Sequence, residues 1–420
     1  MKISPIDNKM LANIDSPEFF GDLTVPEPLV SDNDTSPATK LFVENATKAY
    51  SHYYRNCYNV QTIATNWAEN SKLIFDTSGN LYYAVSNQYN GTYNVTSYIY
   101  KITPNGTIST FASAATNGTY SCSLAFDTSG NLYWAIANAF NGSSVSITSY
   151  VYKITPAGSM TTFASVATNA ASDTDIKFDS SGNLFWSVAN QQVAGPNFNI
   201  NSAVYKITSS GTLTTFAIIA TNGAVGTSLT FDTSGNLYCL MMNSYNGSSY
   251  NIPSYVYKIT PAGSITTFAT ATTNGASTGE LIFDNEDNLY WAALNYYNGS
   301  YKLTSYIYKI TPAGNLTTFA SIATSGASGA SLKIDTSGNL YWSIGNYYND
   351  SSFNLTSYIY KITPAGNLTI FASIASIGGY GSGICFDTNE NLYWAQTNHH
   401  NGSTGNLNSY LHVMTKHSIV

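Results

Sequence analysis

The chain has 420 residues, of which 43% are hydrophobic, 14% aromatic and only 9% charged, and its formal net charge is −7. Such a chain can bury a large core, but its charged fraction is far below the roughly 25% usual in soluble domains. The acidic balance and the absence of any basic cluster exclude nucleic acid and anionic membrane as expected partners.

Residues 1–50 come before any repeated pattern and hold Pro26, Pro28 and Pro37 among small and acidic residues. This composition favours an extended N-terminal arm. Two interpretations stay open, namely a contact with a protein partner or a second copy, and a free tail. The first residues lack the apolar run of a secretory signal, and no stretch reaches the roughly 20 apolar residues that a membrane span needs. We therefore expect no membrane insertion, and the sequence leaves the compartment unknown.

Residues 51–420 are dominated by a phrase close to Phe-Asp-Thr-Ser-Gly-Asn-Leu-Tyr-Trp-Ala, which occurs seven times. Its aspartates are 51 to 53 residues apart, at Asp76, Asp127, Asp179, Asp232, Asp284, Asp335 and Asp387. Each copy holds four short runs rich in Tyr, Phe, Val, Ile and Thr, separated by Gly, Pro and Asn; in the second copy they cover 123–127, 131–140, 146–155 and 160–167. Seven four-stranded antiparallel units predict an all-β, seven-bladed β-propeller.

The two ends of the repeat region predict how the ring closes. The seventh copy ends with a degraded third run at 409–415, and no fourth run follows it. Residues 59–66, NVQTIATN, match the fourth run of the other copies. We therefore predict that a strand at about 57–66 completes the last blade, which removes a free edge between the first and the last blade.

The phrases GNLYWA and YKITPAGNLTTFA resemble the repeats of the NHL and virginiamycin B lyase-like propeller superfamily, over about residues 59–415. The resemblance implies the propeller fold. Lyase members of that superfamily rely on a metal held near His and Glu residues over the central channel. The histidines of this chain, His52, His399, His400, His412 and His417, form no His/Glu cluster in the sequence. Lyase activity, a metal and a cofactor are therefore not expected.

Six copies carry an aromatic or His residue directly before Asn at the turn between runs two and three. The residues are Tyr89, Asn90, Phe140, Asn141, Tyr245, Asn246, Tyr297, Asn298, Tyr348, Asn349, His400 and Asn401. Asn-Gly alone is explained as a type I′ hairpin turn. The aromatic residue has two interpretations, because it can stack on a sugar ring or pack between adjacent hairpins. Several tips also read Asn-x-Ser/Thr and are glycosylation acceptors in a glycosylating compartment.

The first run of each copy approaches the central channel, and there the copies differ. The polar candidates are Asp175, Lys177, Glu280 and Lys333. Unique polar residues are what a catalytic site requires, but isolated charges beside a wet channel need no function. On the other side of each blade, the repeated aspartates are expected to bond their own turns, rather than bind calcium, and to pair with one lysine per blade.

The sequence therefore favours a non-enzymatic structural or interaction propeller, part of an exposed assembly at a virion or cell surface. The alternative is a multivalent carbohydrate-binding propeller that uses the hairpin tips. A divergent lyase or hydrolase with a site at the channel mouth is the third hypothesis.

Overall fold

The computed structural model describes residues 54–191, 198–400 and 406–416. The predicted arm at 1–50 lies outside the described residues. The chain divides into two compact units, and the unit Asn56–Thr415 contains the repeats; the other, Met1–Arg55 with Lys416–Val420, is almost entirely outside the described ranges. In the part of the chain that the structure describes, no helix has the length and apolar character of a membrane span.

The described residues form seven four-stranded antiparallel sheets. Blade 1 is β2 Ala68–Phe75, β3 Leu81–Asn87, β4 Asn94–Ile102 and β5 Ile108–Asn117. Blade 2 is β6 Thr119–Phe126, β7 Leu132–Asn138, β8 Ser146–Ile154 and β9 Met160–Asn169. Blade 3 is β10 Ala171–Phe178, β11 Leu184–Asn190, β12 Asn199–Ile207 and β13 Leu213–Asn222. Blade 4 is β14 Ala224–Phe231, β15 Leu237–Asn243, β16 Asn251–Ile259 and β17 Ile265–Asn274.

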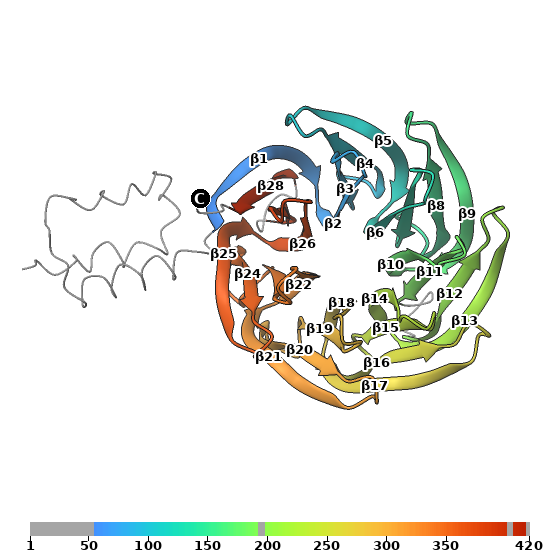
Figure 1. The fold of residues 1–420 in the computed structure, drawn as a ribbon. Helices are drawn as coiled ribbons and strands as arrows, with labels where there is room; N and C mark the ends of the chain where they lie inside the picture. The colour runs from blue at the N-terminus through green and yellow to red at the C-terminus, as the bar shows by residue number, and fades with distance from the viewer. Residues whose placement is uncertain (1–53, 192–197, 401–405, 417–420) are drawn as a thin grey trace, which may run out of the picture. The chain divides into compact units, whose positions relative to one another are not determined.

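Blade 5 is β18 Ala276–Phe283, β19 Leu289–Asn295, β20 Lys302–Ile310 and β21 Leu316–Ser325. Blade 6 is β22 Ala327–Ile334, β23 Leu340–Asn346, β24 Asn354–Ile362 and β25 Leu368–Ile377. Blade 7 is β26 Gly379–Phe386, β27 Leu392–Asn398 and β28 Asn406–Lys416, completed by β1 Tyr54–Asn66. Figure 1 shows the sheets around a common centre, with the first strand of each blade innermost and the fourth at the rim.

The predicted seven-bladed propeller and its closing strand are confirmed. Strand β1 pairs with β28, as the blue and red ribbons in Figure 1 show, and it begins three residues before the predicted start at 57. Thr65 fixes the register of this closure, because its Oγ1 donates to the carbonyl of Leu407 (2.9 Å) and lies 3.0 Å from Ser409 Oγ. The first and last parts of the repeat region are thus joined by strand pairing.

The core lies between adjacent blades. The second strands of blades 1 to 6 are buried along their whole length, because both faces of each sheet are covered by neighbouring sheets. Tyr133 illustrates the packing, since its ring meets Phe163 of its own blade and Phe178 of the next blade edge to face, at centroid distances of 5.0 and 5.1 Å. The repeated aromatic residues therefore bind each blade to the next.

The repeated aspartate organises the turn between the first and second strands. Asp127 Oδ1 accepts hydrogen bonds from the backbone N–H groups of Ser129 (2.9 Å) and Asn131 (2.8 Å), and Oδ2 accepts one from the Asn131 amide. The same bonds recur at the aspartates of all seven blades. The prediction that these carboxylates bond their own turns is confirmed.

The repeated lysine packs beside this turn. In blades 2, 4 and 5 its ammonium lies 3.6 to 3.9 Å from the turn aspartate, as for Lys153 and Asp127. In six blades it lies over an aromatic ring, 5.3 to 5.6 Å from the centroid. The predicted lysine–aspartate pairing therefore holds in three blades, and a cation–π contact is the more general role of this lysine.

Candidate functional site

The hairpin tips between the second and third strands do not form two-residue type I′ turns, so that expectation is wrong. The connection in blade 2 runs from 139 to 145, and of Asn141 and Gly142 only the glycine has a positive φ, +94°. Asn141 instead closes the loop with its side chain, since Oδ1 accepts from the backbone N–H groups of Ser143 (3.0 Å) and Ser144 (2.8 Å). A side-chain-capped turn of this kind does not require positive φ at Asn.

The aromatic residues of the tips are half-buried and pack against the adjacent hairpins. The ring of Tyr245, for example, contacts Phe198 at 5.1 Å and Tyr250 at 4.5 Å, and Tyr250 contacts Tyr297 of the next blade at 5.2 Å. Equivalent contacts involve Tyr89, Phe140, Tyr348 and His400. Packing between hairpins therefore accounts for these residues; Asn401 lies outside the described residues.

The asparagine that ends each second strand joins neighbouring blades. Asn138 Oδ1 accepts from the backbone N–H of Asn117, the last residue of the preceding blade, at 3.0 Å, and its amide donates to the Thr148 carbonyl at 2.8 Å. Asn138 is fully buried. These repeated asparagines are thus structural and are not available to a ligand.

The predicted polar residues near the axis form two separate pairs. Glu280 and Lys333 lie 2.9 Å apart, and Asp175 and Lys177 lie 3.9 Å apart. Lys72 links the two pairs electrostatically: burial lowers its pKa, but Glu280, Asp175 and Asp173 together raise it above its usual value. The sequence missed Lys72 and Asp173 as members of this group.

The carboxylates of this axial group bind the backbone of the next blade. Glu280 Oε2 accepts from Leu332 N–H, and Asp175 Oδ2 accepts from Leu229 N–H, both at 2.8 Å. Serines do the same elsewhere, as Ser228 Oγ does for Leu281 N–H at 3.1 Å. Each innermost strand is a sheet edge, so its free N–H groups need acceptors. The axial carboxylates therefore connect blades, and their oxygens are already engaged.

The pKa values of two axial carboxylates are shifted in opposite directions. Burial raises the pKa of Glu280, but Lys333 and Lys72 outweigh that effect and bring it to about 2. Burial raises the pKa of Asp173 to about 6, although Lys72 and the hydrogen bond from Ser121 oppose the shift. In the described ranges, no three His, Cys, Asp or Glu residues converge to hold a metal ion.

The structure does bring a histidine and a glutamate together, which corrects the expectation of no His/Glu cluster. Nε2 of His399 lies 2.9 Å from Oε1 of Glu69, and both side chains are buried. Glu69 belongs to the first strand of blade 1 and His399 follows the second strand of blade 7. Closure of the ring therefore creates the pair, and no local sequence motif could have revealed it.

Aromatic side chains surround this pair at the junction of blades 7 and 1. The His399 ring contacts Trp67 (5.1 Å), Tyr380 (4.9 Å) and Tyr347 (5.7 Å). Burial and then the Glu69 charge raise the pKa of Tyr347 to about 12, so its phenol stays protonated. The group extends beyond this junction, because Tyr296 of blade 5 contacts Tyr347 and Tyr380, and Tyr120 of blade 2 interacts electrostatically with Glu69. We call the following residues the seam cluster: Trp67, Glu69, Tyr120, Tyr296, Tyr347, Tyr380, His399 and His400.

Trp67 has a backbone conformation that is unusual for its residue type. Its φ is +48°. Trp67 is a crossing residue, that is, the single residue between the last strand of one blade and the first strand of the next. At the other crossings this residue is glycine in five cases and Ala170 in one. Those glycines are Gly118, Gly223, Gly275, Gly326 and Gly378. A bulky residue in this region costs about 1–3 kcal/mol and persists only where its surroundings hold it. The seam is therefore the one crossing in the ring at which a large side chain replaces a small one.

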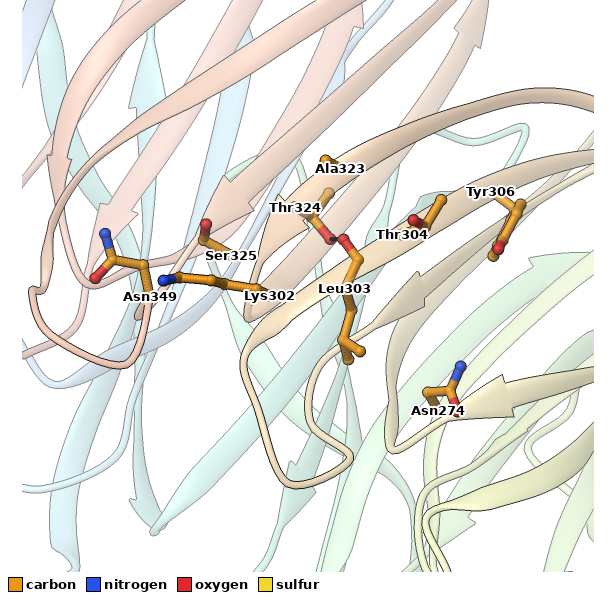
Figure 2. Close-up of a pocket in the computed structure, with 9 residues that line it drawn as sticks. All are labelled: Asn274, Lys302, Leu303, Thr304, Tyr306, Ala323, Thr324, Ser325 and Asn349. Carbon is orange, nitrogen blue, oxygen red and sulfur yellow. Dashed lines mark hydrogen bonds between the residues drawn. The ribbon is translucent and has the colours of Figure 1, made fainter.

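A hollow of about 590 Å³ lies on the outer side of blade 5, lined by β20 and β21 together with Asn274 and Asn349 (Figure 2). Figure 2 shows Lys302 extended toward Asn349, which belongs to the next tip. A second hollow, of about 770 Å³, occupies the equivalent place one blade further. Repeated positions line both hollows, so they are features of the fold; in the first, Lys302 stands where the other blades have Asn or Ser.

The rim strands β5, β9, β13, β17, β21 and β25 are ten residues long and contain no charged residue and no proline. Each lies at the end of its sheet, with one edge unpaired. Three rim residues are the exposed large hydrophobic side chains of the described molecule: Ile218 (62% exposed), Ile265 (40%) and Ile370 (60%). The rim surface is thus uncharged, with mostly Ser and Thr exposed and three exposed isoleucines among them.

No family model and no curated protein matches the chain. Many solved structures share its fold. A protein of unknown function from Dyadobacter fermentans has 11% identity and a TM-score of 0.50, with 86% of this chain and all of that chain covered. A fungal alcohol oxidase of the AA5 family, in complex with copper, has 13% identity and a TM-score of 0.56 over 86% of this chain and 76% of its own. At these identities the similarity shows the propeller fold alone.

Proposed function

We propose that this protein is a non-enzymatic structural propeller that assembles with further copies of itself through its rim strands. The observation that carries the proposal is the set of six uncharged, proline-free rim edges, on which the exposed isoleucines Ile218, Ile265 and Ile370 lie. By resemblance of its repeats, we place it in the NHL and virginiamycin B lyase-like superfamily, without the lyase activity.

Natural edge strands are normally protected by lysine, proline, short length or a bulge, because an unprotected edge pairs with another strand. Here only the bulge is present, as in the register shift between Ile99 and Tyr100 against β5. A ten-residue strand is about 33 Å long, which is ample for strand addition. The rim therefore retains most of the features that promote pairing between chains.

A second copy is the partner that suits these edges best. The rim strands share one Thr- and Ser-rich pattern, so two identical edges can pair antiparallel with Thr opposite Thr or Ser. No charge repulsion opposes that arrangement. Because several equivalent edges point outward from one ring, pairing produces extended arrays, which suits a component of a cell or virion surface.

The test is the oligomeric state of the full chain, measured by light scattering and sedimentation over a wide concentration range. A variant with lysine in the middle of all six rim strands should be monomeric: Ser113→Lys, Ser165→Lys, Ile218→Lys, Thr270→Lys, Ser321→Lys and Ser373→Lys. A control with the same added charge on the exposed turns should still assemble: Thr77→Lys, Thr128→Lys, Ser180→Lys, Thr233→Lys, Asn285→Lys and Thr388→Lys. A parent chain that stays monomeric, or assembly that survives the rim lysines, overturns the proposal.

A further inference from the structure

We infer that the seam cluster is a binding site for a neutral sugar ring, with Trp67 as its stacking surface. The inference is independent of assembly at the rim. It also differs from the expectation of binding at the hairpin tips, because it places recognition at one group of residues around Glu69 and His399 and not at six repeated tips.

The first support is a continuous group of half-buried aromatic rings. Tyr296, Tyr347 and Tyr380 contact one another at centroid distances of 5.4 to 6.4 Å, and Tyr380 leads through His399 to Trp67. Trp67 and the three tyrosines are neither fully buried nor fully exposed. Tyrosine and tryptophan combine a large apolar face with a polar atom, and contiguous partly exposed groups of them mark binding surfaces.

The second support is that Trp67, Glu69 and His399 each occur in one blade alone. Where blade 1 has Glu69, three other blades have serine, one has valine and two have tyrosine, Tyr120 and Tyr380. Where blade 7 has His399, two blades have Ala139 and Ser244, and the other four have Gln88, Gln191, Tyr296 and Tyr347. Blade 4, with Val225 and Ser244, shows that small residues at both positions satisfy the fold, whereas the large residues of the cluster gather in blades 5, 6, 7, 1 and 2. Trp67 also carries a backbone strain that glycine avoids at five other crossings.

The charges of the cluster define the class of ligand. None of its eight residues is lysine or arginine, so it offers no partner to a phosphate or a carboxylate. Glu69 is the one acidic residue of the cluster, so the cluster offers little attraction for a cation. Nε2 of His399 lies 2.9 Å from Oε1 of Glu69, but neither ring nitrogen of His399 makes a hydrogen bond, so the imidazole retains unused capacity for a hydroxyl group. Aromatic faces beside phenol, carboxylate and imidazole groups suit the apolar face and the hydroxyls of a sugar ring.

The test measures binding of a panel of methyl glycosides to the full chain by saturation-transfer NMR. A glycan array extends the panel to larger sugars. Trp67→Gly should weaken the binding of the best glycoside at least tenfold. This variant should fold, because glycine makes the same crossing in five blades, and its thermal unfolding midpoint provides the check. Tyr245→Ala removes a tip aromatic of blade 4 that is packed in a similar way, and it should leave the affinity unchanged.

Three outcomes overturn the inference. The first is the absence of binding to any sugar by the parent chain. The second is binding that survives Trp67→Gly but is lost in Tyr245→Ala, which places recognition at the tips. The third is competition or preferential binding by tetramethylammonium, which identifies the cluster as a cation site. Loss of sugar binding in a folded Trp67→Gly, with Tyr245→Ala unaffected, establishes the seam as the site.

Discussion

Two equivalent crossings between blades, at Gly275 and at Trp67, carry very different side chains. Their comparison shows where the fold requires glycine and where it tolerates a large residue. Gly275 makes its crossing with φ +48°, and a Cβ there would lie 1.8 Å from the carbonyl oxygen of Tyr297. Trp67 adopts the same φ at the seam while carrying the largest side chain of all. The repeat therefore favours glycine for steric reasons, and the ring departs from that rule beside its buried Glu69–His399 pair.

The largest effect is expected at an ordinary crossing. Gly275→Ala should reduce the free energy of unfolding by about 3 kcal/mol, because the new methyl group meets a backbone oxygen and φ is unfavourable for alanine. Urea denaturation measures the change. Gly247→Ala is the matched control, since φ is +91° there but no atom lies within 4 Å of the added Cβ. It should cost only about 1 kcal/mol, and equal losses in both variants would show that the close approach at 275 has no energetic weight.

Glu280, near the axis, is a second residue that departs from the repeat. Unlike Trp67, it should stabilise the ring. Its pKa is about 2 in the folded protein and 4.5 ordinarily, so its contribution is complete above pH 4.5 and is lost as the pH falls toward 2. The unfolding free energy of the parent minus that of Glu280→Gln should fall by about 2 kcal/mol between pH 6 and pH 3.

Asp173 acts in the opposite direction but does not disturb this comparison. Its raised pKa of about 6 means that the folded state binds an extra proton between about pH 4 and pH 6, so its contribution to stability declines as the pH rises through that range. Both proteins share this dependence, and it cancels in the difference. If the difference in unfolding free energy between the parent and Glu280→Gln did not change between pH 6 and pH 3, Lys333 and Lys72 would not stabilise the ionised form of Glu280.

The sequence could predict the features that depend on local, repeated residues, but not those that depend on contacts made only when the ring closes. The repeated Asp127-type turn and the strand pattern are local, so the sequence revealed the propeller, the closing strand and the role of the turn aspartates. It also identified Glu280 and Lys333 as unusual, because Glu280 stands where three other blades have serine, and Lys333 where most blades have an uncharged residue. The Glu69–His399 pair was invisible, because only the closure of the ring brings the two residues together.

At the tips, by contrast, a strong local pattern predicted the wrong turn. Asn141-Gly142 predicted a two-residue turn, but the loop has seven residues, and the asparagine side chain closes it. The aromatic residue at each tip had two interpretations, a ligand site or packing between adjacent hairpins, and neighbouring hairpins do pack against it. A single-sequence pattern reveals which residues recur but does not show which neighbour fills the space beside them.

The smallest expected change in stability is at Trp67 itself. Glycine removes the backbone strain of about 1–3 kcal/mol, but it also removes the ring contacts with Tyr89, His399 and His400 and adds flexibility to the unfolded chain. These effects nearly cancel, so the unfolding free energy of Trp67→Gly should stay within about 1 kcal/mol of the parent value in urea denaturation. Trp134→Ala, at a fully buried core position, should instead cost about 3–5 kcal/mol. A loss of that size at Trp67 would mean that the tryptophan is an ordinary core residue, and the seam would then differ from the other crossings in packing alone.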